Sequence, residues 1–219
     1  LLLLQLLKHR GLASEHIDGV CISCVVPTVL YAIEKASRRY LDAEPVVIGR
    51  GARTGMRVRT DNPREVGADR IVNSVAAYAR HQMALVVVDF GTATTFDCIN
   101  GAGDYLGGAI APGFQISADA LFNRAAKLPR VEVEQPERVI GTNTVQSMQS
   151  GLFFGYVGLV DELARRCKLE LKSQGESQLK CLATGGLARL IGGSCGEIDE
   201  VDDDLTLQGL RLLWERNQP

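Results

Sequence analysis

Five consecutive apolar residues, ALVVV at positions 84–88, run directly into an acidic residue, Asp89. A run this short, rich in β-branched residues and closed by a polar one, is typical of a fully buried strand. A second buried strand is predicted at 179–184, where it leads into Gly185 and Gly186. Because helical patterns separate the predicted strands, the sequence indicates an α/β fold with mixed sheets.

The remaining sequence predicts further strands and helices. Further strands are predicted at 17–26 and 45–48, and a hairpin at 96–100 and 105–110 turns at Gly101-Ala102-Gly103. Helices are predicted at 1–9, 28–39, 69–79, 117–127, 144–172 and 207–215, with a break in the long one among Gly151, Gly155 and Gly158. A boundary near 80–83 would give two units of similar architecture with a cleft between them.

Composition and charge exclude several classes of protein. The 219 residues fit one large or two small domains, and the 46% apolar share can form a buried core. A net charge of -2 without any basic block argues against a nucleic-acid partner. No apolar run is long enough to span a membrane, and LLLLQLL at 1–7 is expected to be a buried helix face rather than a signal peptide.

Six cysteines are scattered among apolar neighbours. Cys21 and Cys24 form a C-x-x-C, but on a predicted strand their side chains point to opposite faces. No second pair follows at zinc-binding spacing. The cysteines are therefore expected to be core thiols of a protein in the reducing cytoplasm.

The segment DFGTATTFD at 89–97 is the strongest candidate for a chemical site. Gly91 permits a tight turn after the buried strand, and backbone N–H groups with the hydroxyls of Thr92, Thr94 and Thr95 can line an anion site. Because a carboxylate beside phosphates needs an intervening cation, Asp89 and Asp97 are candidates for ordering a metal ion or a nucleophile. The alternative is a hairpin with threonines on its exposed face.

A second motif, Gly67-Ala68-Asp69-Arg70, opens a predicted helix. Asp69 falls in the first turn, where the helix dipole and unpaired N–H groups favour anions. Alone, this pattern is more typical of an N-cap aspartate beside a surface arginine. An accessible carboxylate there also suits a base for a substrate hydroxyl.

Three glycine-containing motifs complete the set. TGG at 184–186 and YLGGAIAPG at 105–113 allow a ligand or another backbone to approach closely. IGTNT at 140–144 precedes a helix, where Thr144 is expected to cap the helix or to reach a ligand.

Taken together and in this order, the motifs resemble one family, the type III pantothenate kinases. The matching segments are NPREVGADR at 62–70, VVDFGTATTFD at 87–97, YLGGAIAPG at 105–113, LP at 128–129, IGTNT at 140–144, QSG at 149–151, ATGGLA at 183–188 and DLTLQGL at 204–210. The resemblance covers essentially the whole chain. It implies ATP-dependent phosphorylation of the 4′-hydroxyl of pantothenate, the first step of coenzyme A biosynthesis.

The resemblance also implies a fold. It is that of the acetate and sugar kinase, Hsp70 and actin superfamily, with two ribonuclease-H-like domains, here 1–82 and 83–219, flanking a cleft. The family's first phosphate loop, Asp-x-Gly-Asn-Thr, is not in this sequence, so the first domain is expected to be truncated at its N-terminus. Thr60-Asp61 also occupies a position where many members carry an aromatic residue.

Position by position, the resemblance assigns roles to site residues. Asp69 is implied to be the general base, with Gly67, Ala68 and Arg70 as further pantothenate contacts. Asp89 is implied to bind a monovalent cation, K+ or NH4+, and Thr92 to contact ATP, which enters with Mg2+. Thr144 is implied to contact pantothenate from the partner subunit, and so implies a homodimer.

Two other functions fit parts of the pattern. Some relatives of the family are described as accessory transcription factors, but such a protein would have no need of Asp69, Asp89 and Thr92 together. A different sugar or acid kinase of the superfamily is the other alternative. The succession of GADR and the threonine-rich phosphate loop argues against it.

Overall fold

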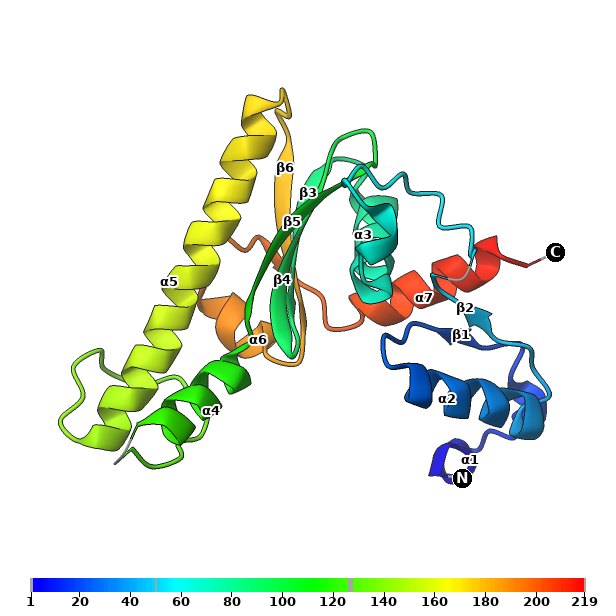
Figure 1. Ribbon diagram of the computed structural model, residues 1–219, viewed down its shortest axis with the longest axis horizontal. Coiled ribbons are helices and arrows are strands. Elements are labelled where there is room, and N and C mark those ends of the chain that lie inside the picture. The colour runs from blue at the N-terminus through cyan, green and yellow to red at the C-terminus, as the bar shows by residue number, and fades with distance from the viewer. Residues whose placement is uncertain (1, 50, 126–127, 219) are drawn as a thin grey trace. The chain divides into compact units, whose positions relative to one another are not determined.

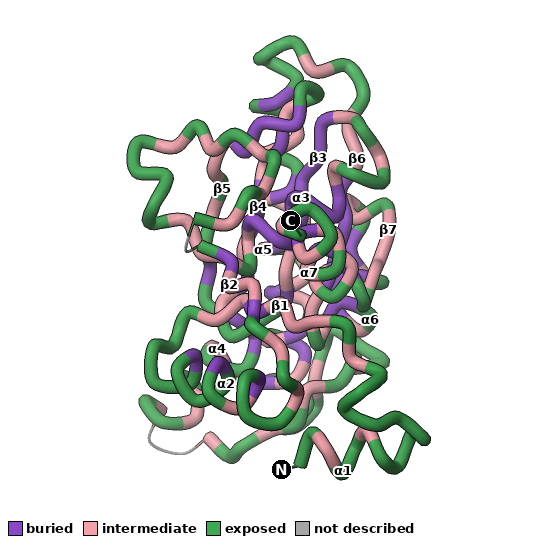
Figure 2. The backbone as a smooth tube through the Cα atoms, turned by 90° about the vertical axis from the view of Figure 1, so that its right-hand side faces the viewer, coloured by how far each residue is buried: buried purple, intermediate pink, exposed green. Residues whose placement is uncertain are grey.

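The computed structural model shows the segment ALVVV as part of β3 (Ala84–Phe90), the middle strand of a five-stranded sheet (Figure 1). The sheet order is β5-β4-β3-β6-β7, built with β4 (Ala93–Ile99), β5 (Tyr105–Pro112), β6 (Leu179–Gly185) and β7 (Glu200–Val201). β3, β4 and β5 are antiparallel neighbours, whereas β6 pairs parallel with β3 and with β7. The predicted α/β fold with a mixed sheet is confirmed, and Figure 2 shows β3 buried along most of its length.

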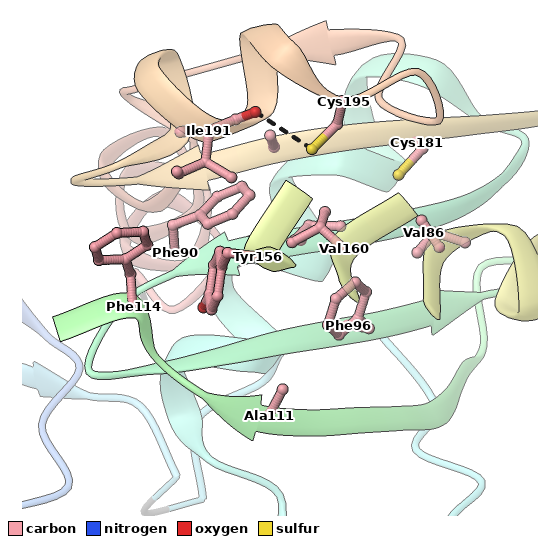
Figure 3. Close-up of a cluster of buried hydrophobic side chains, with 14 of the residues drawn as sticks. Val86, Phe90, Phe96, Ala111, Phe114, Tyr156, Val160, Cys181, Ile191 and Cys195 are labelled. Carbon is pink, nitrogen blue, oxygen red and sulfur yellow. Dashed lines mark hydrogen bonds between the residues drawn. The ribbon is translucent and has the colours of Figure 1, made fainter. Parts of the chain in front are cut away.

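Helices pack one face of this sheet. α4 (Phe114–Arg124), α5 (Thr144–Ser173) and α6 (Ala188–Ile191) enclose an apolar cluster with strand residues such as Val86, Phe90 and Phe96 (Figure 3). Tyr156 of α5 lies within this cluster, with its ring centroid 5.3 Å from that of Phe114. This core fixes the position of the strand ends that carry the candidate site.

The predicted break in the long helix is wrong, because α5 continues without interruption through Gly151, Gly155 and Gly158. The three glycines are exposed, and a Cβ added at any of them would have no neighbour within 4 Å. Each glycine costs a helix about 1 kcal/mol relative to alanine. Burial of Phe153, Tyr156 and Val160 on the opposite face outweighs that cost.

The residues described, 2–49, 51–125 and 128–218, form two compact units. The first unit comprises Leu1–Gly55, Arg64–Ala76 and Thr206–Pro219; the second comprises Met56–Pro63 and Ala77–Leu205 and contains the five-stranded sheet. Within the described residues, no helix has the length and apolarity that a membrane span requires.

The first unit combines helices with a small sheet. Its helices are α1 (Leu2–His9), α2 (Pro27–Tyr40), α7 (Leu205–Arg216) and the beginning of α3 (Ala68–His81). Short 3-10 turns lie at Ser14–His16 and Pro63–Glu65, and a third, in the second unit, at Gly192–Ser194. The strand predicted at 17–26 reduces to β1 (Cys21–Ile22), because its parallel partner β2 (Val46–Val47) offers only two residues for pairing.

Candidate functional site

A tight turn at Gly91-Thr92 joins β3 to β4 and lies at the end of the central strand. The Gly91 N–H donates to the Ala93 carbonyl at 3.2 Å, and Thr92 is exposed. Gly113, the N-cap of α4, braces this turn, since a Cβ at Gly113 would lie 2.1 Å from the Thr92 carbonyl oxygen. The turn is therefore held by backbone packing while its outer surface stays open to a ligand.

Strand pairing brings the TGG motif against Asp89. In the register of β3 and β6, Asp89 lies opposite Thr184 and Phe90 lies opposite Gly185. Gly185 has a φ of +96°, and a Cβ there would lie 2.5 Å from Asp89 Oδ1 and 2.7 Å from the backbone N and O of Phe90. Only glycine satisfies both the left-handed backbone and this close approach.

Two threonines flank the half-buried Asp89 in the sheet. Thr95 on one neighbouring strand and Thr184 on the other share its cross-strand row. The Thr184 hydroxyl is buried and has no hydrogen-bond partner among the described residues. Carboxylate and hydroxyl oxygens are ligands of the kind that hard cations bind, so these residues fit the cation expected at Asp89. Among the described residues, no group of three or more His, Cys, Asp or Glu side chains could hold a metal ion.

Two polar residues expected at the phosphate site are instead part of the folded core. Thr94 is buried, and its hydroxyl is hydrogen-bonded to that of Tyr156. Asp97 is fully buried and accepts hydrogen bonds from the Tyr105 hydroxyl at 2.7 Å and from Thr95 at 3.1 Å. Neither faces the turn, which leaves Thr92 as the threonine displayed there.

Asp69 lies in the first turn of α3 and is exposed. Its Oδ1 accepts the backbone N–H of Arg70 at 2.9 Å, and a Cβ at Gly67 would come within 2.6 Å of the same oxygen. Gly67 thus leaves space for the carboxylate at the positive end of the helix dipole. Gly67, Ala68, Asp69 and Arg70 are contiguous in the first unit, whereas Asp89 and Thr92 belong to the second.

Thr144 is the first residue of α5, but it does not cap the helix. The cap is Asn143, whose side chain accepts the Gln146 N–H at 2.9 Å. Thr144 is exposed and lines a cavity of about 650 Å³ between the start of α5 and residues Leu121 and Leu128. The capping role expected for Thr144 is therefore wrong, and its side chain borders space that a ligand could occupy.

Some of these features have only weak signals in the sequence. TGG is too common a motif to identify the contact of Gly185 with Asp89, and nothing near Thr94 indicated a partner in α5. The register of β3 and β6 was needed to find both Gly185 and Thr184 beside Asp89.

Comparison with known proteins gives consistent results. Residues 1–166 match the family model described as type III pantothenate kinase. A type III pantothenate kinase of Geotalea daltonii is 52% identical over 214 residues, which cover 98% of this chain and 82% of the relative. One of Syntrophotalea carbinolica is 55% identical over 218 residues, covering 100% of this chain and 84% of the relative.

A solved structure gives a comparison of fold. A protein of Campylobacter jejuni, provisionally described as a Baf family transcriptional activator, superposes with a TM-score of 0.60. The match covers 93% of this chain and 86% of the other at 20% sequence identity, so it supports the fold alone.

Proposed function

This chain belongs to the type III pantothenate kinase family, and from that premise we propose that it transfers the γ-phosphoryl group of ATP to the 4′-hydroxyl of pantothenate. This reaction is the first step of coenzyme A biosynthesis. The observation that carries the proposal is the meeting of the DFGT and TGG motifs, which places Asp89 against Gly185 beside the open Gly91-Thr92 turn. Phosphoryl transfer depends mainly on positioning and charge stabilisation, which such a turn and carboxylate supply.

Asp69 is the proposed general base. Its carboxylate is exposed at the start of α3, so a substrate hydroxyl can approach it. Gly67, Ala68 and Arg70 are proposed to contact pantothenate around it. Arg70 supplies a positive charge for the pantothenate carboxylate, and the small residues leave room for the substrate.

Asp89 and Thr92 are proposed to serve the nucleotide. Asp89 would hold K+ or NH4+, and the cation would neutralise negative charge beside the phosphates. Thr92 would hydrogen-bond ATP, bound with Mg2+, through the exposed turn. The cross-strand row of Thr95, Asp89 and Thr184, of which Thr184 is buried, supports a site for a hard cation.

Replacing Asp89 with asparagine tests the cation proposal. We expect the activity of Asp89→Asn to be no longer stimulated by K+. We also expect K+ to no longer raise the melting temperature of this variant in the absence of substrates. Asp119→Asn, a change at a half-buried carboxylate on α4, is the matched control for loss of one negative charge. A variant that keeps a normal K+-dependent melting shift would exclude Asp89 as the cation ligand.

We also propose a homodimer in which Thr144 contacts pantothenate bound by the partner. The support is the family resemblance together with the exposed position of Thr144 on its cavity. The finer fold proposal is two ribonuclease-H-like domains, 1–82 and 83–219, flanking a cleft, in a protein of the cytoplasm. A crystal structure with a bound ATP analogue tests that arrangement directly.

The experiment for the function is product identification. ATP is incubated with pantothenate and, in parallel, with acetate, glycerol or glucose, and phosphorylated products are identified by mass spectrometry. We expect 4′-phosphopantothenate and no other product; phosphorylation of another acceptor instead would favour a different kinase of the superfamily. Absence of any product, with specific DNA binding, would favour a regulator.

A further inference from the structure

Two cysteines line one cavity of the second unit, away from the proposed kinase residues. The cavity has a volume of about 460 Å³ and lies between the β4–β5 hairpin and the C-terminal part of α5. Cys98 of β4 and Cys167 of α5 both border it, and both are half-buried. In the sheet Cys98 lies opposite Gly107, which also lines the cavity.

The two thiols lie close enough to influence each other's ionisation. The interaction with Cys98 lowers the pKa of the Cys167 thiol, and the interaction with Cys167, together with burial, raises the pKa of Cys98. Cys167 is thus the sulfur that more readily becomes a thiolate, the reactive form of cysteine.

Three cysteines outside the pair differ in this respect. Burial raises the pKa of Cys21 to about 11 and that of Cys181 and Cys195 to about 12. These thiols stay protonated at neutral pH and are poor nucleophiles. Cys98 and Cys167 therefore form a pair with one reactive thiol and one adjacent partner, beside space that a small oxidant can enter.

We propose that Cys98 and Cys167 are a modification site, at which a hydroperoxide converts the two thiols into a reversible disulfide. In the first step the Cys167 thiolate attacks the terminal oxygen of the hydroperoxide and the O–O bond breaks, which gives Cys167 sulfenic acid; the leaving alkoxide, or hydroxide from hydrogen peroxide, takes a proton from water. In the second step the Cys98 sulfur attacks the sulfenic sulfur. The S–O bond breaks, and water leaves with the proton of Cys98.

The surroundings suit such a pair. A disulfide needs the sulfurs to close to about 2 Å, and the adjacent cavity gives both side chains room to turn. Arg59 and Glu170 also line the cavity, and Arg59 is paired with Asp104 at 2.5 Å. The site does not depend on the proposed kinase function, since none of the residues assigned to catalysis or binding takes part.

Mapping of the oxidised thiols tests the proposal. The folded protein is treated with hydrogen peroxide, unreacted thiols are blocked with N-ethylmaleimide, and tryptic peptides are identified by mass spectrometry. Cleavage after Arg80, Arg124, Arg166 and Lys168 places Cys98 in residues 81–124 and Cys167 in the dipeptide 167–168, each with a single cysteine. We expect these peptides to be linked with a mass loss of about 2 Da for two thiol hydrogens, and dithiothreitol to separate them.

Variants identify which sulfur reacts first. With dimedone present, Cys98→Ser should give a sulfenic adduct at Cys167, and Cys167→Ser should give at least about tenfold less adduct at Cys98. Cys195→Ser, which removes a buried thiol outside the pair, should oxidise as the unaltered protein does. Whether the Cys98–Cys167 disulfide forms is decided by the linked peptide of the unaltered protein, even if a variant fails to fold.

Three results would overturn the proposal. The first is that Cys98 and Cys167 still react with N-ethylmaleimide after peroxide treatment and are not linked. The second is a disulfide between Cys21 and Cys24 in place of the expected one. The third is overoxidation of Cys167 without a link to Cys98.

Discussion

At the scale of single residues, Gly185 brings the TGG motif of β6 against the DFGT motif of β3 in the candidate phosphate site. Its positive φ and the missing Cβ let β6 end directly against the Asp89 carboxylate and the Phe90 backbone. The neighbouring Gly186 differs, because a Cβ there would meet nothing within 4 Å. The two glycines of one motif therefore have different structural requirements.

We expect Gly185→Ala to lower the free energy of unfolding by about 1–3 kcal/mol or more, and to lower the melting temperature accordingly. Alanine is strained at this φ, and its Cβ would contact backbone atoms. Gly186→Ala is the matched control and should change stability by less than about 0.5 kcal/mol. Thermal and urea unfolding of the two variants measure the difference. Equal stability of both would show that Asp89 and Gly185 do not approach as described.

At this scale, features that depend on local chain geometry could be predicted from the sequence. Asp69 at the start of a helix and the turn at Gly91 follow from nearby residues. Features that depend on a partner distant in sequence could not. Thr94 and Asp97 looked like ligands of a phosphate site, but Tyr156 and Tyr105 bond them in the core.

At the scale of elements, hydrophobic pattern predicted β3, the β4–β5 hairpin, β6 and most helices. Glycines misled the prediction for α5, because local propensity cannot show that the opposite helix face is buried on a sheet. The strand predicted at 17–26 was too long for a related reason, since the length of a strand depends on its partner. Of the helix predicted at 117–127, residues 117–124 fall in α4, Ala125 is the C-cap of α4, and 126–127 lie outside the described residues.

The packing of α7 on α3 gives a test at this scale. A Cβ at Gly209 of α7 would lie 2.3 Å from the backbone carbonyl oxygen of Val72 in α3. Although alanine favours a helix by about 1 kcal/mol, we expect Gly209→Ala to destabilise the protein, by about 1–3 kcal/mol of overpacking. Urea unfolding measures this, with Gly155→Ala of α5, at an open position, as a control expected to be stabilising. A stabilising Gly209→Ala would contradict the close packing of the two helices.

At the scale of the whole molecule, the proposed homodimer makes a prediction about shared sites. If Thr144 serves the partner's substrate, a mixed dimer of Asp69→Asn and Thr144→Ala chains contains one site with both native residues. We expect equal amounts of the two impaired variants, after dissociation and random reassembly, to recover about a quarter of the activity of the unaltered dimer, because about half of the dimers are mixed and each mixed dimer has one intact site. Each variant alone is the control, and sedimentation confirms the dimer. No gain on mixing would place Thr144 in the site of its own chain or outside the site.

The central claim is that Asp69 accepts the pantothenate hydroxyl proton during phosphoryl transfer. The most direct measurement is the rate of 4′-phosphopantothenate formation by Asp69→Asn and by the unaltered enzyme, with circular dichroism and melting temperature showing that both fold alike. We expect Asp69→Asn to lower kcat by a factor of about 10²–10⁴, because the amide cannot take up the proton. A folded variant that forms 4′-phosphopantothenate at the unaltered rate would contradict it.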